Sequence, residues 1–137
     1  MRSDKLYLND IVESSAEVGE FVSGVTEEEF LSSSLIHSAV LQKLIVMGEA
    51  ASRVSPQLRS THADVPWADV RAFRNFAVHA YFSVDWRMVW TTATVDVPRL
   101  RGRIEQIIRA IPESSVADEY RPRIQEPEQS RGESEST

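Results

Sequence analysis

The strongest constraint on the fold is the spacing of apolar residues, which follows the α-helical period over three long stretches. These stretches are 4–23, 27–54 and 85–110, and a shorter one begins at Pro66. Within them apolar side chains recur at i, i+3, i+4 and i+7, the pattern of a helix with one buried face. The sequence therefore predicts an all-α protein, an up-and-down bundle of four to five helices.

The first two predicted helices have recognisable ends. Asp4 is expected to cap the first helix, and Gly24 is expected to end it because glycine accepts the backbone that closes a helix. Thr26 followed by Glu29 has the spacing of a capping box at the start of the second helix.

Interruptions are expected at three places. The second helix, 27–54, should be slightly broken, and 55–65 should form a polar connector. Pro66 fits the first turn of the third helix, where a missing N–H is harmless. Pro98 falls inside the last stretch, so we expect a kink or break near Val97.

The chain is expected to form one helical domain, 1–111, followed by a tail, 112–137. Counting from Pro112, the tail holds seven acidic residues and three arginines, which is −4 of the total charge of −6. It has too few apolar residues to offset the entropy of ordering, so we predict a disordered acidic tail. The tail could bind a basic patch on a partner or shield a site from RNA, and the sequence leaves both readings open.

Composition excludes several classes of function. The chain contains no cysteine, which rules out disulfides, thiolate catalysis and cysteine-bound zinc, and we expect no metal site and no cofactor. No run of eighteen apolar residues is present, so we expect no membrane contact and a cytoplasmic protein. The overall charge argues against nonspecific nucleic-acid binding, but 1–111 carries only −2, so a local basic site is compatible with it.

The most informative stretch for function is 65–90. On a helical wheel, an apolar side is formed by Phe73, Phe76, Ala77 and Ala80. The other side is mostly polar and carries Arg71, Arg74, Asn75 and His79. If the helix continues, Tyr81 lies on the same flank as Arg74.

Arg74 and His79 form an R-x4-H spacing suited to phosphodiester cleavage in RNA without a metal. A histidine can deprotonate the 2′-OH or protonate the leaving oxygen, because its pKa lies near working pH. An arginine can hold the phosphate and its developing charge, and Asn75 could orient the imidazole or the phosphate. The plain alternative is a surface arginine and a histidine favoured at a helix end, since this spacing is common by chance.

Other candidates have structural interpretations. Gly48-Glu49-Ala50 lies inside a helix, where glycine indicates close packing, and a catalytic role for Glu49 is the weaker reading. His37 and His62 have no partners at metal-site spacing. The tryptophans flanking the central stretch are expected to anchor the core or an interface: Trp67, Trp86 and Trp90.

The ordered set of short motifs resembles the HepT-like proteins, also called DUF86, of the HEPN superfamily. The resemblance covers about 4–110. The matching pieces, in chain order, are Leu8-Asn9-Asp10-Ile11, Glu28-Glu29-Phe30, Ala39-Val40, Gly48-Glu49-Ala50, Pro66-Trp67, Arg74-Asn75, His79-x-Tyr81-Phe82, Asp85 and Val89-Trp90.

This resemblance implies a HEPN-like helical fold and a toxin of a toxin–antitoxin module. The family pattern R-x4-6-H-x-Y falls on Arg74, His79 and Tyr81. It implies a homodimer whose two motifs form one ribonuclease site, with Arg71, Arg74 and Tyr81 contacting RNA or a nucleotide. It also implies an antitoxin with an MNT nucleotidyltransferase domain, which would add AMP to Tyr81 or act by occlusion.

Three hypotheses follow. The first is a homodimeric endoribonuclease toxin in which Arg74 and His79 act on the phosphodiester and Asn75 assists. The second is a non-catalytic module that binds a nucleotide, RNA or the partner transferase in the same place. The third makes the central stretch only a dimer interface.

Overall fold

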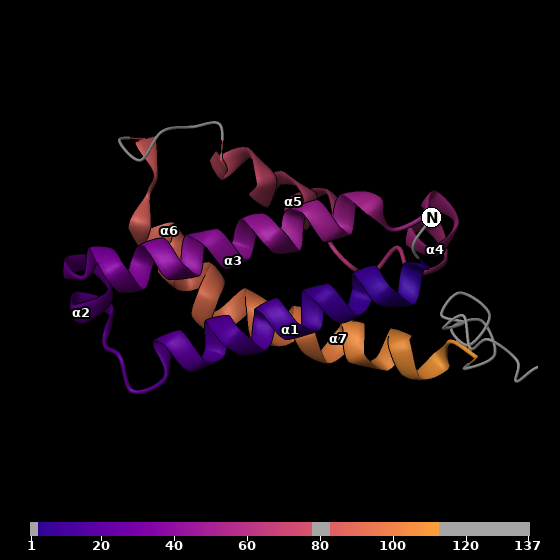
Figure 1. Cartoon of the computed structure of the whole chain (residues 1–137), viewed down its shortest axis with the longest axis horizontal. Coiled ribbons are helices and arrows are strands. Elements are labelled where there is room, and N and C mark those ends of the chain that lie inside the picture. The colour runs from indigo at the N-terminus through magenta and orange to yellow at the C-terminus, as the bar shows by residue number, and fades with distance from the viewer. Residues whose placement is uncertain (1–2, 78–82, 113–137) are drawn as a thin grey trace, which may run out of the picture.

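The computed structural model describes residues 3–77 and 83–112, and these residues form an all-α up-and-down bundle (Figure 1). Its elements are α1 Asp4–Val22, α2 Glu27–Ser32, α3 Ser34–Arg53, α4 Pro56–Thr61, α5 Trp67–Ala72, the 3₁₀ segment η1 Phe73–Ala77, α6 Trp86–Thr91, the π-helical segment η3 Thr92–Asp96 and α7 Val97–Ala110. The described ranges contain no strand. The predicted fold class is confirmed, whereas the predicted tail lies beyond the described residues from residue 113 on.

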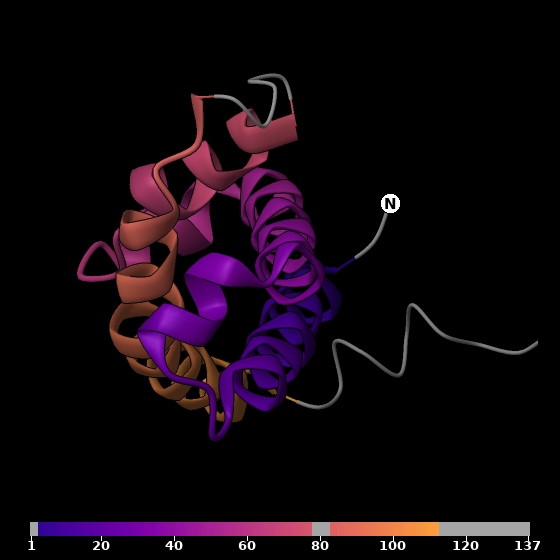
Figure 2. The ribbon, with the colours of Figure 1, turned by 90° about the vertical axis from the view of Figure 1, so that its left-hand side faces the viewer.

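The helices surround one hydrophobic core (Figure 2). Helix α3 packs against α1 on one side and against α5 and η1 on the other, and α1 also packs against α7. The side chains that the helices bury completely include Leu8, Ile11, Phe30, Leu44, Met47, Val89 and Ile104. Each such side chain contributes about 1.5–3 kcal/mol relative to an exposed one, so the core holds the helices together.

The predicted ends of the first two helices are partly confirmed. Gly24 has φ of 70°, and Thr26 caps α2 by accepting a hydrogen bond from the Glu29 amide at 3.1 Å. The predicted cap at Asp4 is wrong, because Ser3 holds that position and its hydroxyl accepts from the Leu6 amide. The Asp4 carboxylate instead accepts from the amide and hydroxyl of Ser55, at 2.8 and 2.6 Å, and so ties α1 to the start of α4.

The break expected in the second helix lies at Ser33. Its backbone is extended, at φ −100° and ψ 102°, which ends α2. Its hydroxyl then accepts a hydrogen bond from the Ile36 amide at 3.2 Å and caps α3. One serine therefore closes one helix and opens the next.

One other sequence interpretation needs correction, and one is confirmed. The connector expected at 55–65 contains a short helix, α4, because Ser55 caps it and Pro56 occupies its first turn. The irregularity expected near Val97 is present as the π-helical segment η3, which ends at Asp96, directly before Val97. The ring of Pro98 would clash with the carbonyl of Thr94 in a regular α-helix, and the wider π turn relieves this conflict.

No helix within the described ranges is long and apolar enough to cross a membrane.

Candidate functional site

The predicted site begins on a helix that changes type in the middle. Helix α5 ends at Ala72, and the chain continues as the 3₁₀ segment η1 through Ala77. A 3₁₀-helix has three residues per turn, so residues three apart lie above one another. Phe73 and Phe76 accordingly stack, with ring centroids 6.2 Å apart and an interplanar angle of 15°.

The α-helical wheel drawn over this stretch is therefore wrong for Phe73–Ala77, although part of its conclusion holds. Phe73 and Phe76 are half-buried against the core, while Arg74 and Asn75 are exposed between them. Ala77, which the wheel placed on the apolar side, is exposed.

Gly48 explains how this segment is held. The glycine lies within α3, and a Cβ built on it would come within 2.5 Å of the Arg74 amide nitrogen and 3.0 Å of the Val70 carbonyl oxygen. Both neighbours are main-chain atoms of α5 and η1, so only glycine permits this approach. The close packing predicted for the Gly48-Glu49-Ala50 triplet is confirmed, and the main chain that it supports is that of the site arginine.

Glu49 lies elsewhere. It is exposed and lines a shallow groove between α1 and α3, together with Tyr7, Asp10 and Arg53. Its neighbour Gly48 faces α5 and η1. Since successive residues of an α-helix point about 100° apart, Glu49 points in a different direction. The structure thus does not bring this carboxylate to Arg74.

The start of α5 is anchored by Trp67. Its side chain is buried, and its indole N–H donates to the His62 carbonyl at 2.9 Å. Trp90 packs on Phe30, with ring centroids 5.1 Å apart. The core-anchoring role predicted for these tryptophans is confirmed.

The described structure resumes at Ser83, and Asp85 caps the start of α6. The Asp85 carboxylate accepts from the amides of Arg87 and Met88, at 3.1 and 3.3 Å. Trp86 stacks on His37, with ring centroids 3.8 Å apart and an interplanar angle of 19°. His37 is thus a structural residue, as expected.

The predicted site residues fall into two groups. Arg71, in the last turn of α5, is exposed, as are Arg74 and Asn75 of η1. Neither arginine forms an ion pair within residues 3–77 and 83–112. His79 and Tyr81 lie outside the described residues.

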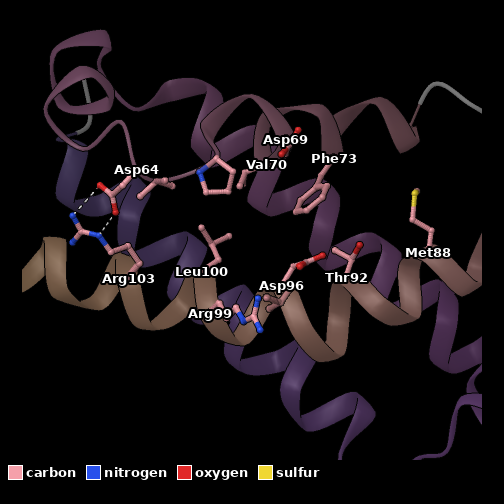
Figure 3. A pocket seen from close by; sticks show the side chains of 13 residues that line it. Asp64, Asp69, Val70, Phe73, Met88, Thr92, Asp96, Arg99, Leu100 and Arg103 are labelled. Carbon is pink, nitrogen blue, oxygen red and sulfur yellow. Dashed lines mark hydrogen bonds and ion pairs between the residues drawn. The ribbon is translucent and has the colours of Figure 1, made fainter.

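A groove of about 680 Å³ lies between α5 and the consecutive helical segments α6, η3 and α7, which we call the α6–α7 rod (Figure 3). The sequence did not reveal this groove. Val70 lines it from α5 and Phe73 from η1, and Val97 and Leu100 line it from α7. In the described part of the chain, no three metal-ligating side chains are grouped there or elsewhere.

An ion pair closes one end of the groove. The Arg103 guanidinium donates to both oxygens of Asp64, at 2.6 and 3.1 Å, and one of its nitrogens lies 3.4 Å from Nδ1 of His62. The hydrogen bond from Arg103 lowers the pKa of the Asp64 carboxyl, and the same contact raises the pKa of Arg103. The partners are 39 residues apart, and no local pattern in the sequence signals such a contact.

Comparison with known proteins identifies the family. Residues 11–107 match the family model described as "Ribonuclease HepT-like". The chain is 35% identical over 106 residues to "Probable ribonuclease HepT" of Thermococcus cleftensis, covering 77% of this chain and 96% of that protein. It is 33% identical over 104 residues to "Putative RNase MJ1380" of Methanocaldococcus jannaschii, covering 76% and 95%. No solved structure gives a significant match. The matched region contains all of α3, α5 and η1, and the chain belongs to the ribonuclease HepT-like family.

Proposed function

We propose that the protein is an endoribonuclease that cleaves RNA without a metal ion and acts as the toxin of a toxin–antitoxin module. The observation that carries the proposal is the placement of Arg74. Its backbone is held against Gly48, while Arg74 and its neighbour Asn75 are both exposed. It also opens the R-x4-H-x-Y pattern in a chain of the ribonuclease HepT-like family.

The proposed reaction is an internal transfer at phosphorus. The 2′-oxygen forms a bond to the phosphorus, and the bond from phosphorus to the 5′-oxygen breaks, which leaves a 2′,3′-cyclic phosphate and a 5′-hydroxyl. A base takes the 2′-OH proton, and an acid gives a proton to the leaving oxygen. His79 serves as acid or base, while Arg74 binds the phosphate and stabilises its charge.

The two proton transfers favour a homodimer. A single imidazole is either protonated or neutral when the reaction begins, so acid and base together require two of them. A second copy supplies the other His79 and another Arg74. Asn75 assists by orienting an imidazole or the phosphate, and Arg71 adds positive charge for the RNA backbone.

Tyr81 is the proposed control point. An MNT-domain nucleotidyltransferase acts as the antitoxin by transferring AMP from ATP to its hydroxyl, with release of pyrophosphate. The phosphodiester that forms carries a negative charge, which would compete with RNA for the arginine and repel the substrate phosphate. Intact mass after co-expression with the neighbouring gene product, compared with that of Tyr81→Phe, tests this step.

The direct test of catalysis compares His79→Ala and Arg74→Ala with wild type on a labelled RNA in the presence of EDTA. Both variants are expected to lose cleavage while keeping their helical content and oligomeric state. Arg109→Ala is the matched control, because Arg109 is an exposed arginine in the last turn of α7 and is expected to leave cleavage unchanged.

The second candidate function is a non-catalytic module that binds RNA, a nucleotide or the transferase. The low charge of 1–111, only −2, favours it over a strongly basic nuclease surface. Under this alternative, any cleavage in the wild-type sample comes from contamination and is equal in His79→Ala. If His79→Ala instead dissociates the dimer, the central stretch is an interface, and the catalytic assignment is wrong.

A further inference from the structure

The groove between α5 and the α6–α7 rod combines an apolar floor with charged side chains at its edges. It is elongated along the helices, with the Asp64–Arg103 ion pair at one end and Met88 at the other (Figure 3). Met88 is 50% exposed and adds an apolar side chain at its end of the groove. The groove therefore offers an apolar floor to a long and narrow occupant.

Its rim carries two exposed acidic side chains. Asp69 on α5 and Asp96 at the end of η3 are exposed on opposite sides of the groove. Neither forms an ion pair within the described ranges, whereas Asp64 is neutralised by Arg103. Arg99 adds one positive charge on the α7 side. An occupant that combines apolar groups with two positive charges fits this surface, whereas a polyphosphate or RNA strand would meet both carboxylates.

We propose that this occupant is the segment Tyr120-Arg121-Pro122-Arg123-Ile124 of the same chain. Within the acidic tail it is the stretch that combines two arginines with large apolar residues. Arg121 and Arg123 pair with Asp69 and Asp96, while Tyr120 and Ile124 cover the apolar floor. Pro122 fixes its own φ and disfavours helix at the residue before it, which suits an extended segment in a narrow groove.

The length of the tail permits this contact. Helix α7 ends at Ala110, and the rise of an α-helix places Leu100 roughly 15 Å back along its axis. The eight residues from 113 to 120 can span roughly 26 Å when extended. Tyr120 can therefore reach the groove even if the tail first passes around α7.

Paramagnetic relaxation enhancement in the full-length chain tests the proposal. Since the chain has no cysteine, Ala117→Cys provides a single attachment point for a nitroxide label. The label is expected to broaden the amide signals of Val70 and Val97, in the groove, and to leave that of Val18 on α1 sharp. Broadening spread evenly over the surface, or absent from the groove, would overturn the proposal.

Charge reversal tests the specific pairing. Arg121→Glu with Arg123→Glu should abolish the broadening in the groove, and adding Asp69→Arg with Asp96→Arg should restore it. A loss without restoration would contradict the assigned ion pairs. The tail substitutions leave the core untouched, so misfolding is not expected to confuse the first result.

Mixed samples identify which chain supplies the segment. Nitroxide-labelled protein at natural isotope abundance is mixed with ¹⁵N-labelled protein that carries no nitroxide. Broadening in this mixture would mean that a second copy provides the tail, and it would overturn docking within one chain. Because none of these measurements uses RNA cleavage, their outcome is independent of the proposed nuclease activity.

Discussion

Replacing Gly48 with alanine probes the contact between α3 and the backbone of the site. The new Cβ would lie 2.5 Å from the Arg74 amide nitrogen, whereas ordinary contacts begin at 3.4 Å, so main-chain atoms must retreat by roughly 0.9 Å. Overpacking of this kind costs about 1–3 kcal/mol. Alanine returns about 1 kcal/mol through its higher helix propensity. The expected net loss in the free energy of unfolding is up to about 2 kcal/mol.

Gly102→Ala is the matched control. Gly102 lies within α7, and a Cβ there would meet no atom within 4 Å, so this substitution is expected to stabilise the protein by about 1 kcal/mol. Urea unfolding followed by circular dichroism measures both changes. Since the propensity gain is common to the two, the difference between them isolates the overpacking cost. Equal stabilisation by both alanines would refute the close approach at Gly48.

Three further predictions concern stability. Asp4→Ala should lower the free energy of unfolding by about 1–3 kcal/mol, because the Ser55 amide and hydroxyl lose their acceptor, and urea unfolding checks this. Thr26→Ala should cost about 1 kcal/mol through loss of the α2 cap, measured in the same way. Arg103 lowers the pKa of Asp64, so their ion pair should stabilise the fold above the unfolded-state pKa and lose this effect as pH falls through the folded-state pKa. The stabilities of wild type and Asp64→Asn should therefore converge in acid.

Local patterns in the sequence predicted the features that depend on neighbouring residues. The end of α1 near Gly24 and the cap at Thr26 follow from backbone freedom and from a hydroxyl placed three residues before an amide. The packing role of Gly48 was also predictable, because glycine destabilises a helix interior relative to alanine and its presence there indicates close packing. Its contact with Arg74 did not follow, since the two residues are distant in the chain.

The features that the sequence did not predict depend on contacts between distant segments. The helix changes from α5 to η1 where the main chain of Val70 and Phe73 packs against Gly48 of α3. A helical wheel could not predict this change, because it assumes one helical period throughout. The groove and the Asp64–Arg103 pair arise only when α7 is placed beside α5. For the candidate site, the exposure of Arg74 was predictable, while the positions of His79 and Tyr81 stay predictions.

A mixing experiment tests whether the proposed ribonuclease site needs both copies of the motif. Wild type and His79→Ala are unfolded together and refolded at equal amounts, so that random pairing leaves about one quarter of the dimers with two intact chains. If the acid and the base come from different copies, activity should fall to about a quarter of that of the same total amount of wild type, because mixed dimers lack one proton-transfer group. If each copy acts alone, about half should remain, since every intact chain keeps its own site. Mixing wild type with Arg109→Ala controls for losses during refolding and should leave activity unchanged. A decrease to only about half of the wild-type activity would refute the composite site, while leaving the nuclease assignment itself in place.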